Sequence, residues 1–317
     1  MNDKKKVDEI IQKGENLLLE GKAADAVALY DEAIERNPAS ARLYVARGNA
    51  YFCERNWRFA CRDYTIAVRM NPDNAETFYS LGLVTFLMDA PETALKCYTR
   101  AIELKPDYAD AYYNRGVIYD EMGMYMTASE DYSKAIELNP EMTSAWNNRG
   151  NDWVDMEEYE NALADFNEVI RLNPAREKAY GNRGYVRQKL GDIEGALEDY
   201  DKALESDPDD GGTYANRGRL FLERKDYQAA IDDFSELIRL APMNATAYEL
   251  RAEAYTAAGN AEAAAEDLKK AEAFDSRVEP DDEDEEDDGC TCDHGDCGCD
   301  HGCSCGDPPS DEPESDE

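Results

Sequence analysis

The stretch AYYNRGVIYDEMGMYMTASEDYSKAIELNP, residues 111–140, decides the fold of this 317-residue chain. Its Gly116, Ala128 and Pro140 have counterparts at a fixed spacing along most of the sequence. Prolines stand 34 residues apart, at positions 38, 72, 106, 140, 174, 208 and 242. A fixed period of this length is typical of a repeat protein, in which one structural unit recurs along the chain.

Placing each proline near the end of its unit divides residues 7–278 into eight repeats. The units are 7–40, 41–74, 75–108, 109–142, 143–176, 177–210, 211–244 and 245–278. Residues 1–6 form an N-terminal extension, 279–289 an acidic spacer, 290–305 a Cys/His-rich segment and 306–317 an acidic tail. We expect the acidic C-terminal segments to be disordered, because they are highly charged and have little apolar surface to bury.

Each unit repeats the same small and large residues, counted here by place from its first residue. The eighth place is Gly in seven units, the twentieth is Ala in all eight, and the fourth and twenty-fourth are mostly aromatic. These stripes at helical spacing predict two helices per unit, with a turn at positions such as Gly123 and Gly191. Proline ends the second helix. Since one hairpin cannot bury its apolar face alone, neighbouring hairpins must stack.

This pattern closely resembles the tetratricopeptide repeat (TPR) family, and the resemblance covers residues 7–278. It implies an all-α fold, a right-handed superhelical solenoid of antiparallel helix pairs. The family also implies that the first helix of each unit lines a concave groove where ligands bind. The expected function is therefore a non-catalytic protein–protein interaction scaffold that holds an extended peptide or a helix.

Two residue types vary together among the repeats. The same six units carry Arg at the seventh place and Asp at the twenty-third, whereas the third unit has Leu81 and Cys97 instead. We interpret this as an ion pair between the two helices of each hairpin, since the planar guanidinium suits a fixed carboxylate. The alternative is a row of arginines that binds acidic ligands. The arginines are Arg47, Arg115, Arg149, Arg183, Arg217 and Arg251.

Asparagine occupies the sixth place of four successive units, although it is a mediocre helix former. One interpretation is a set of recent duplicates with Asn on a polar face. The other is a ladder of amides that binds a peptide main chain, as a similar ladder does in the repeats of O-linked N-acetylglucosamine transferase. The candidate peptide-binding residues are Asn114, Asn147, Asn148, Asn151, Asn182, Asn216 and Lys178.

The chaperone-binding branch of the family uses a carboxylate clamp of Lys, Asn and Arg residues. Only fragments of this clamp match: Asn148 and Lys178 are present, but Tyr113 and Val117 stand where Lys and Asn belong. An acidic groove also disfavours an acidic ligand. We therefore do not expect binding to the C-termini of heat-shock chaperones.

Charge narrows the choice of partners. The formal net charge is −37, and residues 279–317 hold 18 of the 71 acidic residues and no Lys or Arg. Such a chain repels phosphate backbones and anionic lipids, so we expect protein or peptide partners, favour basic ones, and expect neither nucleic acid nor membrane. The N-terminus has no apolar region typical of a signal peptide, and the expected location is the cytoplasm.

No constellation of residues indicates an active site. The chain has two histidines, both in the tail, and no phosphate loop or dinucleotide fingerprint. We therefore expect a protein that is not an enzyme.

The tail suggests a competing function, metal handling. Six thiols and two imidazoles would suffice for two tetrahedral sites, with zinc or another thiophilic metal as the ion and the repeats docking a client. The alternative is an acidic tail whose cysteines are redox targets or ligate nothing. A third idea is self-inhibition, with the tail over groove residues such as Lys178 and Arg219. The candidate ligands are Cys290, Cys292, His294, Cys297, Cys299, His301, Cys303 and Cys305.

Overall fold

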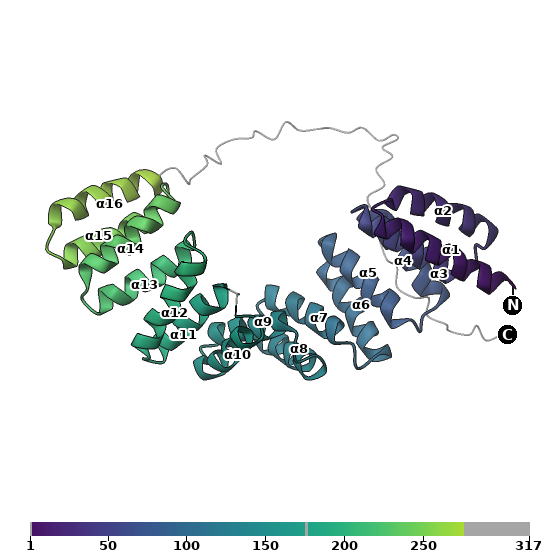
Figure 1. Ribbon diagram of the computed structural model, residues 1–317, viewed down its shortest axis with the longest axis horizontal. Helices are drawn as coiled ribbons and strands as arrows, with labels where there is room; N and C mark the ends of the chain where they lie inside the picture. Colours follow the sequence, from purple (N-terminus) through teal and green to yellow (C-terminus); the bar gives the residue numbers. More distant parts are fainter. Residues whose placement is uncertain (1, 175–176, 276–317) are drawn as a thin grey trace, which may run out of the picture. The chain divides into compact units, whose positions relative to one another are not determined.

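The computed structural model describes residues 2–174 and 177–275, which form sixteen α-helices and no β-strand (Figure 1). The spacer, the Cys/His-rich segment and the acidic tail lie outside these residues. The helices are α1 (Asn2–Leu19), α2 (Ala23–Arg36), α3 (Ala41–Cys53), α4 (Trp57–Met70), α5 (Ala75–Leu87), α6 (Pro91–Leu104), α7 (Ala109–Glu121), α8 (Tyr125–Leu138), α9 (Thr143–Asp155), α10 (Tyr159–Leu172), α11 (Glu177–Lys189), α12 (Ile193–Ser206), α13 (Gly211–Glu223), α14 (Tyr227–Leu240), α15 (Ala245–Ala257) and α16 (Ala261–Asp275).

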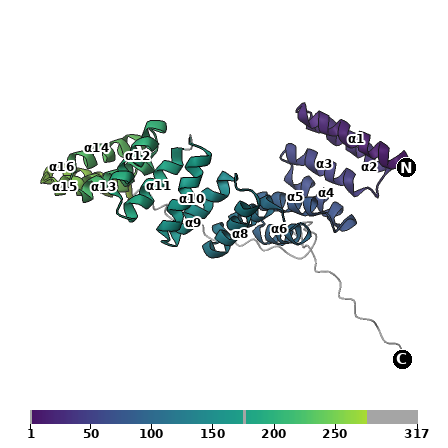
Figure 2. The same ribbon diagram turned by 60° about the horizontal axis from the view of Figure 1, so that its bottom comes forward.

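The helices pair in the predicted order, with an odd-numbered first helix and an even-numbered second helix in each unit. Every helix contacts the next one along the chain, and neighbouring first helices such as α11 and α13 also touch (Figures 1 and 2). The all-α solenoid predicted from the repeats is confirmed. Helix α1 begins at Asn2, so the residues before the first unit lengthen its first helix.

The small eighth residue makes room for the aromatic ring at the twenty-fourth place. A Cβ atom on Gly116 would lie 2.8 Å from the Tyr132 ring, and one on Gly150 would lie 2.9 Å from the Phe166 ring. Both rings are completely buried. Each of the first seven hairpins therefore has one aromatic ring packed against a helix surface that has no side chain of its own, which explains why the two places repeat together. The eighth hairpin has Ala252 and Leu268 at these places instead.

The turn between the two helices of a unit keeps one backbone conformation whatever its residue. Gly123 and Gly191 have φ values of 71° and 83°, as expected for glycine in the left-handed region. Glu157 and Lys225 hold the same place in other units with φ values of 60° and 64°. Packing of the helices therefore imposes this turn even where the side chain disfavours it.

The predicted ion pair within each hairpin is confirmed in all six units. Each guanidinium donates through Nε and Nη2 to the two carboxylate oxygens of its aspartate, over 2.6–2.9 Å. Each guanidinium also lies over the aromatic ring at the fourth place, as Arg149 lies 4.9 Å from the Trp146 centroid. The arginines thus bind internal carboxylates rather than forming a free row for acidic ligands.

The third guanidinium nitrogen, Nη1, bonds to the preceding hairpin, which sequence analysis missed. Arg149 Nη1 donates to Ser133 Oγ over 2.8 Å, and the other five arginines make the same bond to a polar residue at the twenty-fifth place. A polar residue 16 positions before each arginine was the available signal. We call the guanidinium with its aspartate, its aromatic ring and this polar residue the arginine clamp.

One buried carboxyl group breaks the pattern of the core. Asp152 is completely buried at the tenth place of its unit, where units two to four and six to eight have apolar residues. Within the described part of the chain, neither of its oxygens accepts a hydrogen bond from a donor group, and the carboxyl group of Asp120 is its hydrogen-bonding neighbour. Burial, then the nearby Asp120 and Asp155, raise the pKa of Asp152 to about 8. The group is therefore protonated at neutral pH.

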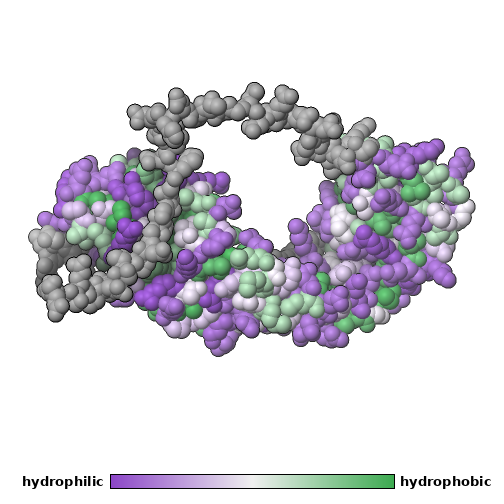
Figure 3. Space-filling view, turned by 180° about the vertical axis from the view of Figure 1, so that it is seen from behind, coloured by the Kyte–Doolittle hydropathy of each residue, from purple (hydrophilic) through white to green (hydrophobic). Residues whose placement is uncertain are grey.

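On the face in Figure 3 hydrophilic residues dominate, and hydrophobic ones lie among them in small groups. Among residues 2–174 and 177–275, no helix combines the length and apolar character needed to cross a membrane.

Removing one arginine of a clamp should destabilise the solenoid strongly. Arg149→Ala leaves Asp165 buried without its cation, and we expect a loss of about 3–5 kcal/mol in the free energy of unfolding. The matched control is Arg171→Ala in the same unit, which removes an exposed pair with Glu168 and should cost less than about 1 kcal/mol. Urea unfolding followed by circular dichroism measures both, and equal losses would contradict the clamp.

The buried Asp152 should make stability depend on pH. From about pH 4 to pH 8 the folded chain keeps a proton that the unfolded chain releases, because the ordinary pKa is 3.8. The free energy of unfolding should therefore fall as the pH rises through this window, by up to about 1.4 kcal/mol per pH unit.

Two variants test this origin of the pH dependence. Asp152→Asn should reduce the slope without abolishing it, because burial also raises the pKa values of Asp120, Asp165 and Asp233. Glu121→Gln, at an exposed residue next to Asp120, should keep the full slope. The measurement is urea unfolding of the three chains at several pH values. Parallel profiles for the wild type and Asp152→Asn would show that another group is responsible.

Candidate functional site

A polar cavity of about 360 Å³ lies on three successive first helices, α9, α11 and α13. Five of the seven candidate peptide-binding residues line it. We call it the asparagine cavity. Its lining residues are Asn147, Asn151, Lys178, Gly181, Asn182, Asp210, Gly212, Thr213 and Asn216.

The two remaining candidates, Asn114 and Asn148, lie outside the cavity and bond to tyrosines of the preceding hairpin. Asn114 Nδ2 donates to the Tyr79 hydroxyl over 2.9 Å. Asn148 Nδ2 donates more weakly, over 3.4 Å, to the hydroxyls of both Tyr113 and Tyr132. Burial raises the pKa of Tyr79, so its hydroxyl stays protonated. These two amides therefore join adjacent hairpins, and one ladder in the sequence becomes two groups with different partners.

The amides of the cavity are less engaged. Asn182 Nδ2 donates to Asn151 Oδ1 over 3.2 Å, and Asn147 Nδ2 donates weakly to Asn148 Oδ1 over 3.4 Å. Among the residues that the structure describes, the side chain of Asn216 has no hydrogen-bond partner. The cavity thus offers donors and acceptors that a ligand can use.

One wall of the cavity is fixed by the start of α13. Asp210 caps this helix by accepting from the Thr213 amide over 3.2 Å, and Thr213 Oγ1 donates to Asp210 Oδ2 over 2.6 Å. Opposite this wall, Gly181 is buried, and a Cβ atom on it would lie 2.8 Å from Thr213 Oγ1. The cavity exists partly because residue 181 has no side chain.

The charges at the cavity nearly balance. Lys178 is an exposed cation, and Asp210 is the one carboxylate among the lining residues. The other polar groups that line it are neutral amides and a hydroxyl. Such a surface selects ligands by hydrogen bonding more than by net charge.

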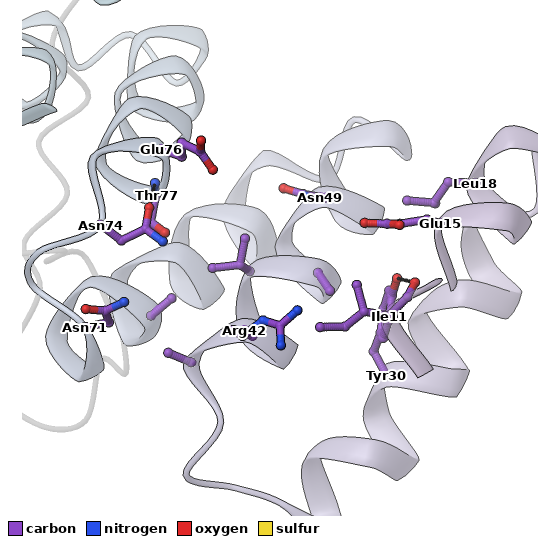
Figure 4. A pocket seen from close by; sticks show the side chains of 14 residues that line it. Ile11, Glu15, Leu18, Tyr30, Arg42, Asn49, Asn71, Asn74, Glu76 and Thr77 are labelled. Carbon is purple, nitrogen blue, oxygen red and sulfur yellow. Dashed lines mark hydrogen bonds between the residues drawn. The ribbon is translucent and has the colours of Figure 1, made fainter. Parts of the chain in front are cut away.

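A second cavity, of about 270 Å³, lies near the N-terminus between α1, α3 and α5 (Figure 4). Glu15 and Leu18 reach it from α1, and Asn74 and Glu76 line it from the start of α5. Its basic residue, Arg42, is paired with Asp8. The asparagine ladder did not indicate this cavity, because the lining residue at the sixth place is Ala46 rather than asparagine, although Asn49 and Asn151 hold the same place in the two cavities.

Comparison with models of protein families shows which family the repeats match. Models described as tetratricopeptide repeat match residues 109–142, 143–175 and 177–210, and also 11–57 and 215–277. A model described as TPR repeat matches residues 92–123. A search of curated proteins found no match.

Solved structures share the fold at low sequence identity. The C-terminal part of a TPR repeat-containing protein from Cytophaga hutchinsonii has a TM-score of 0.63 at 17% identity, over 76% of this chain and 98% of that one. A tetratricopeptide repeat protein from Parabacteroides merdae has a TM-score of 0.54 at 21% identity, over 78% and 98%. YrrB has a TM-score of 0.52 at 24% identity, over 56% and 92%. With matches to the repeat models over most of its length, the chain belongs to the tetratricopeptide repeat family.

Proposed function

We propose that this chain is a non-catalytic interaction scaffold that binds an extended peptide segment at the asparagine cavity. The observation that carries the proposal is the convergence of four amides from three successive first helices on one cavity. A carboxamide donates and accepts hydrogen bonds, so it can pair with both the N–H and the C=O of a peptide main chain. YrrB, which shares the fold, is described as a TPR protein with an unusual peptide-binding site.

An extended segment fits the spacing of the amides. Packed helices lie about 8–10 Å apart, and an extended chain rises about 3.3 Å per residue. A ligand that crosses α9, α11 and α13 therefore meets a new helix roughly every three residues. A helical ligand would turn its main chain inward and away from the amides.

The charge of the whole chain favours a basic partner. With a net charge of −37, the field around the solenoid attracts cations and accelerates their approach. The nearly balanced cavity then provides the short-range contacts. We propose that basic residues of the ligand flank the part held by the amides.

Replacing cavity amides should weaken peptide binding. Asn182→Ala with Asn216→Ala removes two hydrogen-bonding groups, each worth about 0.5–1.5 kcal/mol, so we expect a loss of about five- to hundredfold in affinity. The ligands would be peptides selected from a displayed random library with the full chain as bait. Titration calorimetry measures their affinity.

The matched control is Asn114→Ala, which removes the same amide at the same place of another unit. Asn114 bonds to Tyr79 and lies outside the cavity, so we expect unchanged affinity. Circular dichroism would verify that both variants remain helical. Equal affinity of the double variant and the wild type would refute the cavity as the binding surface.

A second candidate function, metal handling, rests on the eight Cys and His side chains in residues 290–305, which lie outside the described residues. Density of thiols and imidazoles is the observation that favours it. The full chain, purified without chelator, should carry at least one equivalent of zinc or another thiophilic metal, and a chain ending at residue 278 should carry none. Elemental analysis decides, and a full chain without bound metal would exclude this function.

A further inference from the structure

An internal contact repeats between adjacent hairpins: an asparagine amide donates to a tyrosine hydroxyl. Asn114 bonds to Tyr79 and Asn148 bonds to Tyr113, and the two residues of each pair are 35 positions apart. In repeat terms, the sixth place of one unit contacts the fifth place of the unit before it. The geometry of the stack therefore brings these two places together at both of these steps.

The next two steps keep the asparagine but lose the tyrosine. The sixth place remains Asn182 and then Asn216, whereas the fifth place of the preceding unit becomes Asn147 and then Gly181. Asn182 bonds instead to Asn151. Asn216, opposite a residue without a side chain, makes no hydrogen bond to any described residue.

The asparagine cavity lies where the tyrosines are missing. Both Asn147 and Gly181 line it, and so do Asn182 and Asn216. Its volume of about 360 Å³ falls in the range of small-ligand sites, roughly 300–1,000 Å³. The repeat has thus retained a hydrogen-bond donor and removed the side chain that elsewhere accepts from it.

We propose that the asparagine cavity is a socket for a tyrosine side chain of the bound peptide, whose hydroxyl accepts a hydrogen bond from Asn216 Nδ2. The ligand would supply the group that Tyr79 and Tyr113 supply internally, three and two units earlier respectively. This inference rests on the proposed function and names the side chain that the peptide-binding site selects.

The socket admits a ring from the ligand but not one attached to residue 181. The third place of the next unit determines whether a side chain fits at the fifth place. This residue is Ala145 in the unit that follows Tyr113, whereas it is Thr213 in the unit that follows Gly181. Thr213 Oγ1 occupies the space that a Cβ atom at 181 would need, and its bond to Asp210 holds it there. A ring that enters from solvent does not need that space.

The hydroxyl should decide between tyrosine and phenylalanine. A site that provides a hydrogen-bond donor is left with an unpaired amide when the ligand lacks the acceptor. The cavity walls are mostly polar, so a phenyl ring gains little there from apolar contacts. We therefore expect peptides with a single central tyrosine to bind about threefold to tenfold more tightly than their phenylalanine counterparts.

The test uses the full chain and displayed random peptides, followed by synthetic peptides that carry Tyr, Phe or Ala at the selected position. We expect enrichment of tyrosine and the affinity order Tyr, Phe, Ala. Asn216→Ala should then erase the difference between Tyr and Phe while retaining binding through the other amides. The socket would be overturned if the selected peptides were not enriched in tyrosine. It would also be overturned if Asn216→Ala kept the difference in affinity between the Tyr and Phe peptides.

A self-filled variant gives an independent test. Gly181→Tyr with Thr213→Ala copies the Tyr113–Ala145 arrangement, so its own ring should occupy the socket and tyrosine peptides should lose at least tenfold in affinity. Thr213→Ala alone adds no ring to the socket, so it should keep the preference for Tyr over Phe peptides that the double variant loses. Unchanged binding to a folded double variant overturns the socket.

Failure of the proposed function is distinct, since peptides would then bind equally to the wild type and to Asn182→Ala with Asn216→Ala.

Discussion

The arginine clamp is the contact on which the arrangement of this solenoid depends. A guanidinium has a rigid planar fork, so bonding two of its nitrogens to Asp165 and the third to Ser133 fixes the angle between neighbouring hairpins as well as within one. Because desolvation offsets much of the attraction in a buried ion pair, the clamp contributes geometry more than net stability. That geometry brings the sixth place of one unit to the fifth place of the unit before it.

The third unit and Asp152 depart from the clamp pattern, and both departures follow from the cost of burying an unpaired charge. In the third unit, Leu81 and Cys97 replace both partners of the pair and are buried, so no charge is left alone in the interior. Replacing a buried pair as a whole is tolerated, whereas losing one partner is costly. Asp152 is the opposite case. It is a buried carboxyl without a cation, and it retains its proton to about pH 8 instead of ionising.

The sequence predicts what repeats within a unit and misses what depends on the offset between units. The 34-residue period and the sizes of the repeated residues were enough to predict the helical hairpins. The joint loss of Arg and Asp in the same unit was enough to predict the ion pair between them. The partner of the third guanidinium nitrogen varies from Asp31 to Thr99 to Asn167, so no single residue type marks it, and the available signal was its polar character alone. Asn114 and Asn216 hold the same place in their units, but only Asn114 has a hydrogen-bond partner among the described residues. That partner is Tyr79 of the preceding unit, whereas the corresponding residue for Asn216 is Gly181, and only the stacking of the units brings these residues together.

A binding site in a repeat protein must interrupt the repeat, and its position in the unit decides what the interruption does. The tenth place is in the core, where an acidic residue such as Asp152 meets no cation among the described residues and makes stability depend on pH. The fifth place faces the neighbouring first helix, where removing a tyrosine leaves a space and an unused amide without opening the core. At Gly181 the buried rings of Tyr200 and Phe234 keep their places while Asn216 loses its partner. Replacing a large side chain with a small one at the fifth place can therefore create a selective binding site at little cost in stability.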